Sequence, residues 1–468
     1  MKLVRLAAAV AFVGWVPGLG QAAESAARPP HIVYILSDDQ GWKDVGFHGS
    51  DIRTPNLDAL ARGGARLEQL YAQPMCTPTR AALMTGRYPH RYGLQTLVIP
   101  SAGRYGLPTD ERLLPQALKE AGYRTAIVGK WHLGHADRKY WPRQRGFDYQ
   151  YGPLIGELDY FTHEQHGVLD WYRNNEPVRE PGYTTTLLGD DAVRYIAKHD
   201  TSRPFFMYLT FNAPHTPYQA PQEWLDKYSN IEDPSRRAYA ASITAMDYQI
   251  GRVVAELDRR GIRDNTLIVF QSDNGGTRNA QFAGELDMTN VKLPPDNGPY
   301  REGKGTLYEG GTLVPALANW PGHIPAGTEV SGMIHVVDIY PTLVRLAGGT
   351  TAKAKPLDGL DVWGAIADGK PSPRTEIVYN VEPLRAAIRQ GDWKLVWITP
   401  LPQKVELYDL AKDPFEQKNV AAEHPAEVAK LERRVDELAA QAAESLFMKV
   451  EAGKMLEGMH GAPVLPED

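Results

Sequence analysis

Polar side chains with acid, base or ligand chemistry follow four apolar runs of the sequence, at the point where each run ends. The apolar runs occupy residues 31–36, 125–129, 205–211 and 266–270. The polar groups that follow them are Asp38, Asp39, Lys130, His132, His215, Asp273 and Asn274. Carboxylates, imidazoles and lysines can bind a cation, hold an anion and transfer protons. Because four separate runs end in this way, the sequence predicts an active site.

The oxygen-bearing members of this set favour a hard cation. Asp38, Asp39, Asp273 and Asn274 offer only oxygen ligands, which suit calcium better than zinc. Asp38-Asp39 taken alone is more often a solvated turn. A second pair of oxygen ligands at another strand end shifts the interpretation toward a metal site.

The single cysteine lies in a segment with its own chemistry. Residues 76–87 read CTPTRAALMTGR, and Thr77-Pro78 predicts the start of a helix. Cys76 therefore lies at or just before a helix N-terminus, where free backbone amides and the helix dipole favour an anion. Arg80 lies within the first turn and can reach the same position. From spacing alone, an ordinary buried cysteine is an equally good interpretation.

The elements that must position these residues alternate between strands and helices. Continuous apolar runs are typical of strands buried on both faces. Helical patterns lie between them, with a start signal at Thr54-Pro55, a stop signal at Gly122 and a long apolar stripe over residues 239–260. The alternation predicts an α/β fold with a large, mostly parallel, doubly wound sheet. Ligands bind beyond the carboxyl ends of such strands.

The character of the sequence changes after residue 349. Four short strand-like segments are followed by a helix with an apolar stripe. The segments are residues 375–380, 385–389, 393–399 and 405–408, and the stripe is Val428, Leu431, Val435 and Leu438. We expect a catalytic domain over residues 30–349 and a smaller C-terminal subdomain over residues 350–468, with an antiparallel sheet and a terminal helix.

The composition argues against two classes of protein, and the N-terminal residues indicate export. The 468 residues carry 51 basic and 57 acidic side chains, which argues against nucleic-acid binding, and one cysteine excludes a disulfide framework. Lys2 and Arg5 precede an apolar stretch over residues 6–20 that is too short to span a bilayer. Residues 1–22 are therefore predicted to be a signal peptide. We expect an exported, periplasmic or secreted protein without stable membrane insertion.

The cysteine segment resembles the signature of the formylglycine-dependent (type I) sulfatases. The resemblance rests on Cys76-x-Pro78-x-Arg80 with Leu83, Thr85, Gly86 and Arg87, although Thr79 stands where the family usually has Ser. It extends over roughly residues 30–415 through the stretches 38–42, 45–49, 129–134, 272–276 and 356–359. It implies an alkaline-phosphatase-like sulfatase fold. Within the family the pattern is closest to the arylsulfatase B, or N-acetylgalactosamine-4-sulfatase, type.

The resemblance also implies cofactors and roles. Cys76 would be oxidised to Cα-formylglycine by a formylglycine-generating or sulfatase-maturing enzyme, and its hydrate, a geminal diol, would attack sulfur. One Ca²⁺ would be held by the modified Cys76 together with Asp38, Asp39, Asp273 and Asn274. The residues expected around the sulfate are Arg80, Lys130, His132, His215 and Lys304, with Lys292 as the alternative lysine. His215 with Lys304 would protonate the leaving oxygen, and His132 would be the base that releases sulfate.

The expected activity is hydrolysis of a sulfate monoester. The substrate would be an aryl sulfate or a sulfated sugar such as a galactosamine-4-sulfate-type glycan. Two alternatives stay open: a phosphomonoester or phosphonate hydrolase, and an inactive sulfated-glycan-binding protein with an unmodified cysteine. Trp171-Tyr172 and Tyr183 either line a sugar-binding cleft or pack beneath a loop.

Overall fold

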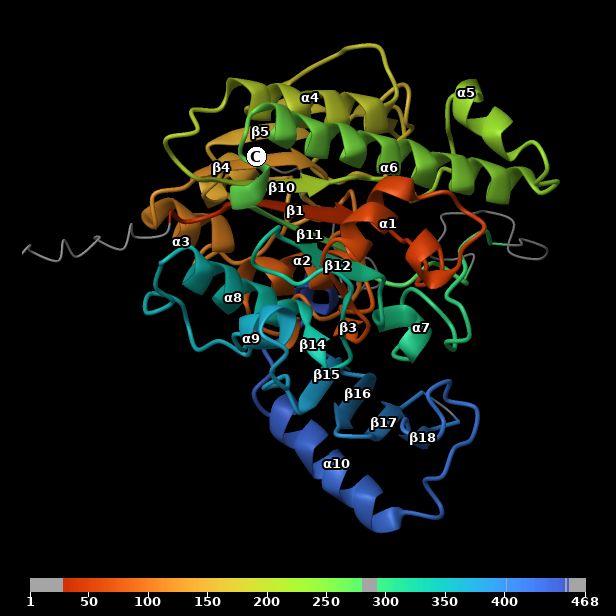
Figure 1. The fold of residues 1–468 in the computed structure, drawn as a ribbon. Coiled ribbons are helices and arrows are strands. Elements are labelled where there is room, and N and C mark those ends of the chain that lie inside the picture. The colour runs from red at the N-terminus through yellow and green to blue at the C-terminus, as the bar shows by residue number, and fades with distance from the viewer. Residues whose placement is uncertain (1–27, 280–292, 401, 451–452, 454–468) are drawn as a thin grey trace, which may run out of the picture.

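A ten-stranded sheet forms the centre of the computed structural model, which describes residues 28–279, 293–400, 402–450 and 453 (Figure 1). The predicted signal peptide and Lys292 lie outside the described residues. The strand order is β13-β2-β12-β11-β1-β10-β4-β5-β8-β9. The four predicted central strands are confirmed as β1 (His31–Ser37), β4 (Arg124–Gly129), β10 (Phe205–Thr210) and β11 (Thr266–Ser272).

The central strands run parallel and end at the same level. Ser37 pairs with Ser272, Leu36 with Thr210, and Thr210 with Gly129. Each of these residues is at or next to the last residue of its strand. The polar residues that follow the strands therefore meet at one edge of the sheet, as parallel topology requires.

Helices cover both faces of the sheet (Figure 1). Alternate residues of β1 face opposite sides: Tyr34 packs in the core beneath α2 (Cys76–Thr85), α3 (Leu114–Glu120) and α8 (Ile339–Leu346). Val33 packs in the core beneath α1 (Pro55–Arg62), α4 (Thr184–Lys198) and α6 (Pro234–Arg259). Helix α6 begins at Pro234, ahead of the predicted apolar stripe, because Asp233 caps its first turn by accepting the Ser235 N–H at 2.9 Å.

The outer strands make the sheet mixed. On one side lie β12 (Ala316–Asn319), β2 (Ala65–Leu67) and β13 (Thr328–Val330), and β12 runs antiparallel to both of its neighbours. On the other side lie β5 (Tyr149–Gly152), β8 (Tyr172–Arg173) and β9 (Glu176–Pro177). These strands have two to four residues each, too few to give an apolar run in the sequence.

A second, four-stranded antiparallel sheet lies below the main body (Figure 1). It consists of β15 (Glu376–Val381), β16 (Arg385–Gln390), β17 (Trp393–Ile398) and β18 (Lys404–Asp409). The terminal helix α10 (Pro425–Ala439) packs Leu431, Val435 and Leu438 against one face, which confirms the predicted antiparallel sheet with a helix.

Short elements complete the described part of the chain. They are β3 (Leu70–Tyr71), β6 (Glu164–Gln165), β7 (Val168–Leu169), β14 (Ile334–His335), α5 (Gln222–Leu225), α7 (Glu309–Thr312) and α9 (Trp363–Ala367). Among the described residues, no helix has both the length and the apolar character needed to cross a membrane.

Candidate active site

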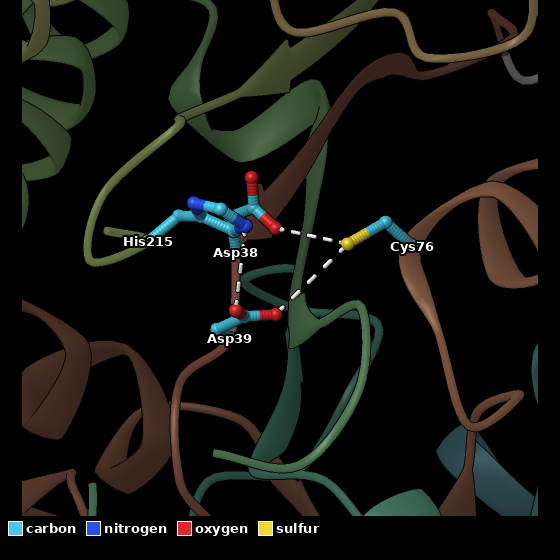
Figure 2. A group of neighbouring side chains, drawn as sticks. All are labelled: Asp38, Asp39, Cys76 and His215. Atoms are coloured by element: carbon cyan, nitrogen blue, oxygen red, sulfur yellow. Dashed lines mark hydrogen bonds and ion pairs between the residues drawn. The ribbon is translucent and has the colours of Figure 1, made fainter. Parts of the chain in front are cut away.

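Cys76 is the first residue of α2 and faces the carboxyl edge of the sheet. Its Sγ atom lies 3.4 Å from Asp38 Oδ1 and 3.9 Å from Asp39 Oδ1 (Figure 2). Burial, together with the charge of Asp273, raises the pKa of the Cys76 thiol well above its ordinary value. The encoded thiol therefore stays protonated, and a protonated thiol is a weak nucleophile.

Three carboxylates and one amide converge beside Cys76, and all four are at most 3% exposed. The Asp39 N–H donates to Asp273 Oδ1 at 3.1 Å, and Asn274 Nδ2 donates to Asp39 Oδ1 at 2.8 Å. The Oδ1 atom of Asn274 is buried and has no hydrogen-bond partner among the residues that the structure describes. Buried polar atoms are almost always paired, so this oxygen and the carboxylates fit a bound cation that accepts oxygen ligands.

A lysine or arginine pairs with each carboxylate. Arg80 Nη2 donates to Asp273 Oδ2 at 2.8 Å, and Lys130 Nζ donates to Asp38 Oδ2 at 2.5 Å. Burial by itself would raise the pKa of Asp38, yet the charge of Lys130 and its other cationic neighbours holds that pKa well below the usual range. Burial, reinforced by the charge of Asp38, raises the pKa of Asp273 to about 7.

Lys304 is distant from these residues in the sequence and pairs with the third carboxylate, Asp39. Its Nζ atom donates to Asp39 Oδ2 at 2.7 Å and lies 3.3 Å from His215 Nε2. Burial would lower the pKa of Lys304, but the charge of Asp39 raises it well above the ordinary value. The ammonium group is therefore charged and fixed between a carboxylate and an imidazole.

The two predicted histidines have different surroundings. His215 Nδ1 lies 2.7 Å from the Thr216 carbonyl oxygen, which leaves Nε2 facing Lys304 and Asp39 at 3.3 and 3.5 Å. His132 Nε2 lies 3.2 Å from the Ile99 carbonyl oxygen, and its Nδ1 atom has no partner in the described structure. Burial, then the charge of Lys130, lowers the pKa of His132 well below its ordinary value. His132 is therefore neutral, with one lone pair free to accept a proton.

Every residue predicted for the site lies at this edge, except the alternative Lys292, which lies outside the described residues, and two supporting contacts had no signal in the sequence. The Tyr160 hydroxyl donates to the carbonyl oxygens of Asn212 and His215 at 2.8 and 2.7 Å and so fixes the backbone that carries His215. The Thr77 hydroxyl donates to the His132 carbonyl oxygen at 3.0 Å. Tyr160 lies in an irregular loop between β5 and α4, so no periodic pattern indicated it.

Two of the three aromatic residues considered for a sugar-binding cleft are buried. Trp171 is 0% exposed and Tyr183 is 5% exposed. The indole N–H of Trp171 donates to Glu180 at 3.0 Å, and the Tyr183 hydroxyl donates to the Gln219 carbonyl oxygen at 3.0 Å. These two residues pack beneath a loop, which is the second of the two interpretations left open by the sequence.

Known proteins resemble this chain in sequence and in fold. The sulfatase family matches residues 30–349, and the family described as N-sulphoglucosamine sulphohydrolase, C-terminal, matches residues 302–441. Arylsulfatase J of Mus musculus is 34% identical over 472 residues, which cover 89% of this chain and 77% of the relative. The N-acetylgalactosamine-6-sulfatase of Homo sapiens is 33% identical over 389 residues, which cover 79% of this chain and 72% of the relative.

Two solved structures resemble this protein in fold. The crystal structure of Ps i-CgsB in complex with k-i-k-neocarrahexaose has a TM-score of 0.81 and 32% identity, and covers 93% of this chain and 98% of the other. The phosphonate monoester hydrolase of Agrobacterium radiobacter, 22% identical with a TM-score of 0.63, covers 88% of this chain and 96% of the other and shares the fold.

The chain belongs to the sulfatase family. It is a sulfuric ester hydrolase with the alkaline-phosphatase-like sulfatase fold. Neither relative named above is an arylsulfatase B, so the particular resemblance to that type stays a prediction.

Proposed function

We propose that this enzyme removes sulfate from a sulfated saccharide, using a formylglycine formed from Cys76 and one calcium ion. The observation that carries the proposal is the set of three carboxylates around Cys76, each paired with a different buried cation. A sulfate monoester brings a compact anion, which such cations can bind, and charge moves onto the leaving oxygen during cleavage.

The proposed calcium ligands are Asp38, Asp39, Asp273, Asn274 and the modified Cys76. The unpartnered Asn274 Oδ1 supports its place in this set, and ligand atoms of Asp38, Asp39 and Cys76 lie within 4.8 Å of one another and of a His215 ring nitrogen. A bound calcium would polarise oxygen atoms near it, and a hydrated formylglycine would supply a hydroxyl nucleophile in place of the thiol.

Side chains of this protein would bind the sulfate and transfer the protons. Arg80, Lys130 and Lys304 would bind and orient the sulfate oxygens, because their charges are fixed before substrate arrives. His215 would donate a proton to the leaving alcohol from Nε2, with Lys304 beside it. His132 would accept a proton at the free Nδ1 atom in the step that releases sulfate.

We place the substrate among sulfated sugars, with a galactosamine-4-sulfate-type glycan as the first candidate. Two of the named proteins support a saccharide substrate: one is an N-acetylgalactosamine-6-sulfatase, and Ps i-CgsB was crystallised in complex with k-i-k-neocarrahexaose. We also propose a division into a catalytic domain, residues 30–349, and a C-terminal subdomain, residues 350–468, in an exported protein.

The test is sulfate release from a panel of defined sulfated saccharides, with 4-nitrophenyl sulfate and 4-nitrophenyl phosphate run in parallel. We expect free sulfate from at least one saccharide and little turnover of the phosphate ester. Preferred turnover of the phosphate ester would support the phosphohydrolase alternative. Saccharide binding without turnover by protein that contains only unmodified Cys76 would support the glycan-binding alternative.

A further inference from the structure

The small antiparallel sheet packs directly against the segment that carries Lys304, here called the lysine loop (residues 301–308). Helix α10 covers one face of this sheet. Side chains of the other face, among them Ile377 and Val396, form an apolar cluster with Leu307 and Leu313, which flank the end of the lysine loop. The lysine loop therefore packs against the face of the C-terminal sheet that α10 does not cover.

Hydrogen bonds fix the lysine loop at several points. The Arg385 guanidinium donates to the carbonyl oxygen of Gly305, the residue after the lysine. The Tyr308 hydroxyl donates to Glu406 Oε2 at 2.6 Å. The Gly305 N–H donates to the Pro74 carbonyl oxygen at 2.7 Å, just ahead of Cys76 on the chain. The loop thus connects the C-terminal sheet with the segment that leads into α2.

A buried cluster of three charged residues, Lys394, Glu309 and Glu416, lies at the end of the lysine loop. Lys394 on β17 lies 3.0 Å from Glu309 Oε1 and 2.7 Å from Glu416 Oε1. Glu416 Oε2 also accepts the backbone N–H of Glu309 at 2.7 Å, at the start of α7. The hydroxyls of Tyr379 and Tyr71 donate to the Glu309 carboxylate at 2.5 and 2.9 Å. The three charged residues are 0–3% exposed.

The cluster holds two carboxylates and only one lysine between them. Burial raises the pKa of Glu416 to about 7, and Lys394 opposes this rise. Without the lysine, two buried carboxylates would repel each other across the contact that fixes the start of α7. Arg389 also acts on Glu309 by its charge, but Lys394 is the cation that lies within 3.0 Å of both carboxylates.

We propose that Lys394 is a positioning residue for the sulfatase reaction: by bridging Glu309 and Glu416 it holds the lysine loop so that Lys304 stays against Asp39 and His215. This inference rests on the proposed function, in which Lys304 binds sulfate and assists His215. None of the three cluster residues touches Asp39 or His215 through a contact in the described structure, so their effect on catalysis passes through the loop.

The experiment compares three variants of the full chain. Lys394→Met removes the bridge, and Arg385→Met, a milder change at a partly exposed side chain, removes the bond to Gly305 together with the local ion pair with Glu382. Arg374→Met is the matched control, because Arg374 is also buried, 6% exposed, and paired with one carboxylate, Asp338, yet contacts no residue of the lysine loop. Values of kcat and KM are measured for the sulfated saccharide that the wild type hydrolyses and for 4-nitrophenyl sulfate, well below each variant's Tm.

We expect Lys394→Met and Arg385→Met to lower kcat on the saccharide about tenfold or more, because displacement of a catalytic group by about 1 Å is enough for such a loss. The loss on 4-nitrophenyl sulfate should be smaller, since that leaving group needs little assistance. In a Lys304→Ala background, either substitution should add almost nothing, because residues that act through one another are not additive. Arg374→Met should leave kcat on both substrates unchanged even where it lowers Tm.

Two results would overturn the inference. One is full additivity of Lys394→Met and Lys304→Ala, and the other is unchanged saccharide kcat in a folded Lys394→Met protein. If Lys394→Met does not fold, Glu416→Gln, which removes the charge of one of the two bridged carboxylates, takes its place in the same measurements. A wild-type protein that releases no sulfate from any substrate would instead refute the proposed function, so the two failures can be told apart.

Discussion

Replacement of His215 by alanine should damage the reaction selectively, according to the alcohol that leaves. His215 Nε2 lies 3.3 Å from Lys304 Nζ and 3.5 Å from Asp39 Oδ2. A positioned general acid contributes about 10²–10⁴-fold to the rate, which is about 3–5 kcal/mol of transition-state stabilisation. We expect His215→Ala to lose this factor on a sugar sulfate and less than about tenfold on 4-nitrophenyl sulfate, whose leaving group is already a weak base.

The assay is a pair of steady-state measurements, sulfate release from the saccharide and nitrophenolate release from the aryl ester. His163→Ala is the control, because His163 is buried but hydrogen-bonded to Gly182 outside the site, and it should leave the ratio of the two rates unchanged. His132→Ala should slow both substrates by a similar factor, since its free Nδ1 atom would act after the alcohol has left. Equal losses on both substrates for His215→Ala would refute the acid role and leave His215 as a sulfate-binding group.

Three further outcomes are expected. The peptide that contains Cys76 should be about 18 Da lighter by mass spectrometry than its sequence encodes. Cys76→Ala should abolish turnover. Active protein in which mass spectrometry finds only unmodified Cys76 would contradict the proposed nucleophile. Asp273→Ala should lower bound calcium and activity together, measured by elemental analysis and sulfate release, because one anionic ligand is lost; full activity after exhaustive chelation would exclude the metal. Burial raises the pKa of Asp247 from 3.8 to about 6, so its contribution to stability is complete below pH 4 and is lost as the pH rises to about 6, by roughly 3 kcal/mol. The unfolding free energy of Asp247→Asn relative to wild type should therefore rise over that range in denaturant titrations, and a constant difference would show that Asp247 does not titrate as stated.

Much of the site was predictable because its residues directly follow buried parallel strands. Asp38, Lys130 and Asp273 each come within two residues of the end of a central strand. The register of the sheet brings those strand ends to one level. Residues that directly follow the strands therefore lie close together in space. The outer strands and the support that Tyr160 gives to His215 were missed, since short strands and loop contacts leave no periodic signal.

The class of the protein, the central strands and the residue types at their carboxyl ends follow from the order of the amino acids alone. Periodicity, helix-start signals and a contiguous motif are local properties, and each can be recognised without knowing what lies across the fold. The partner of each buried charge depends on the folded structure: Lys304 pairs with Asp39, Arg80 with Asp273, and Lys394 with both Glu309 and Glu416. Those pairs join residues up to 265 positions apart, and because the energy of a buried charge depends on atoms within a few ångströms, no pattern along the chain specifies it.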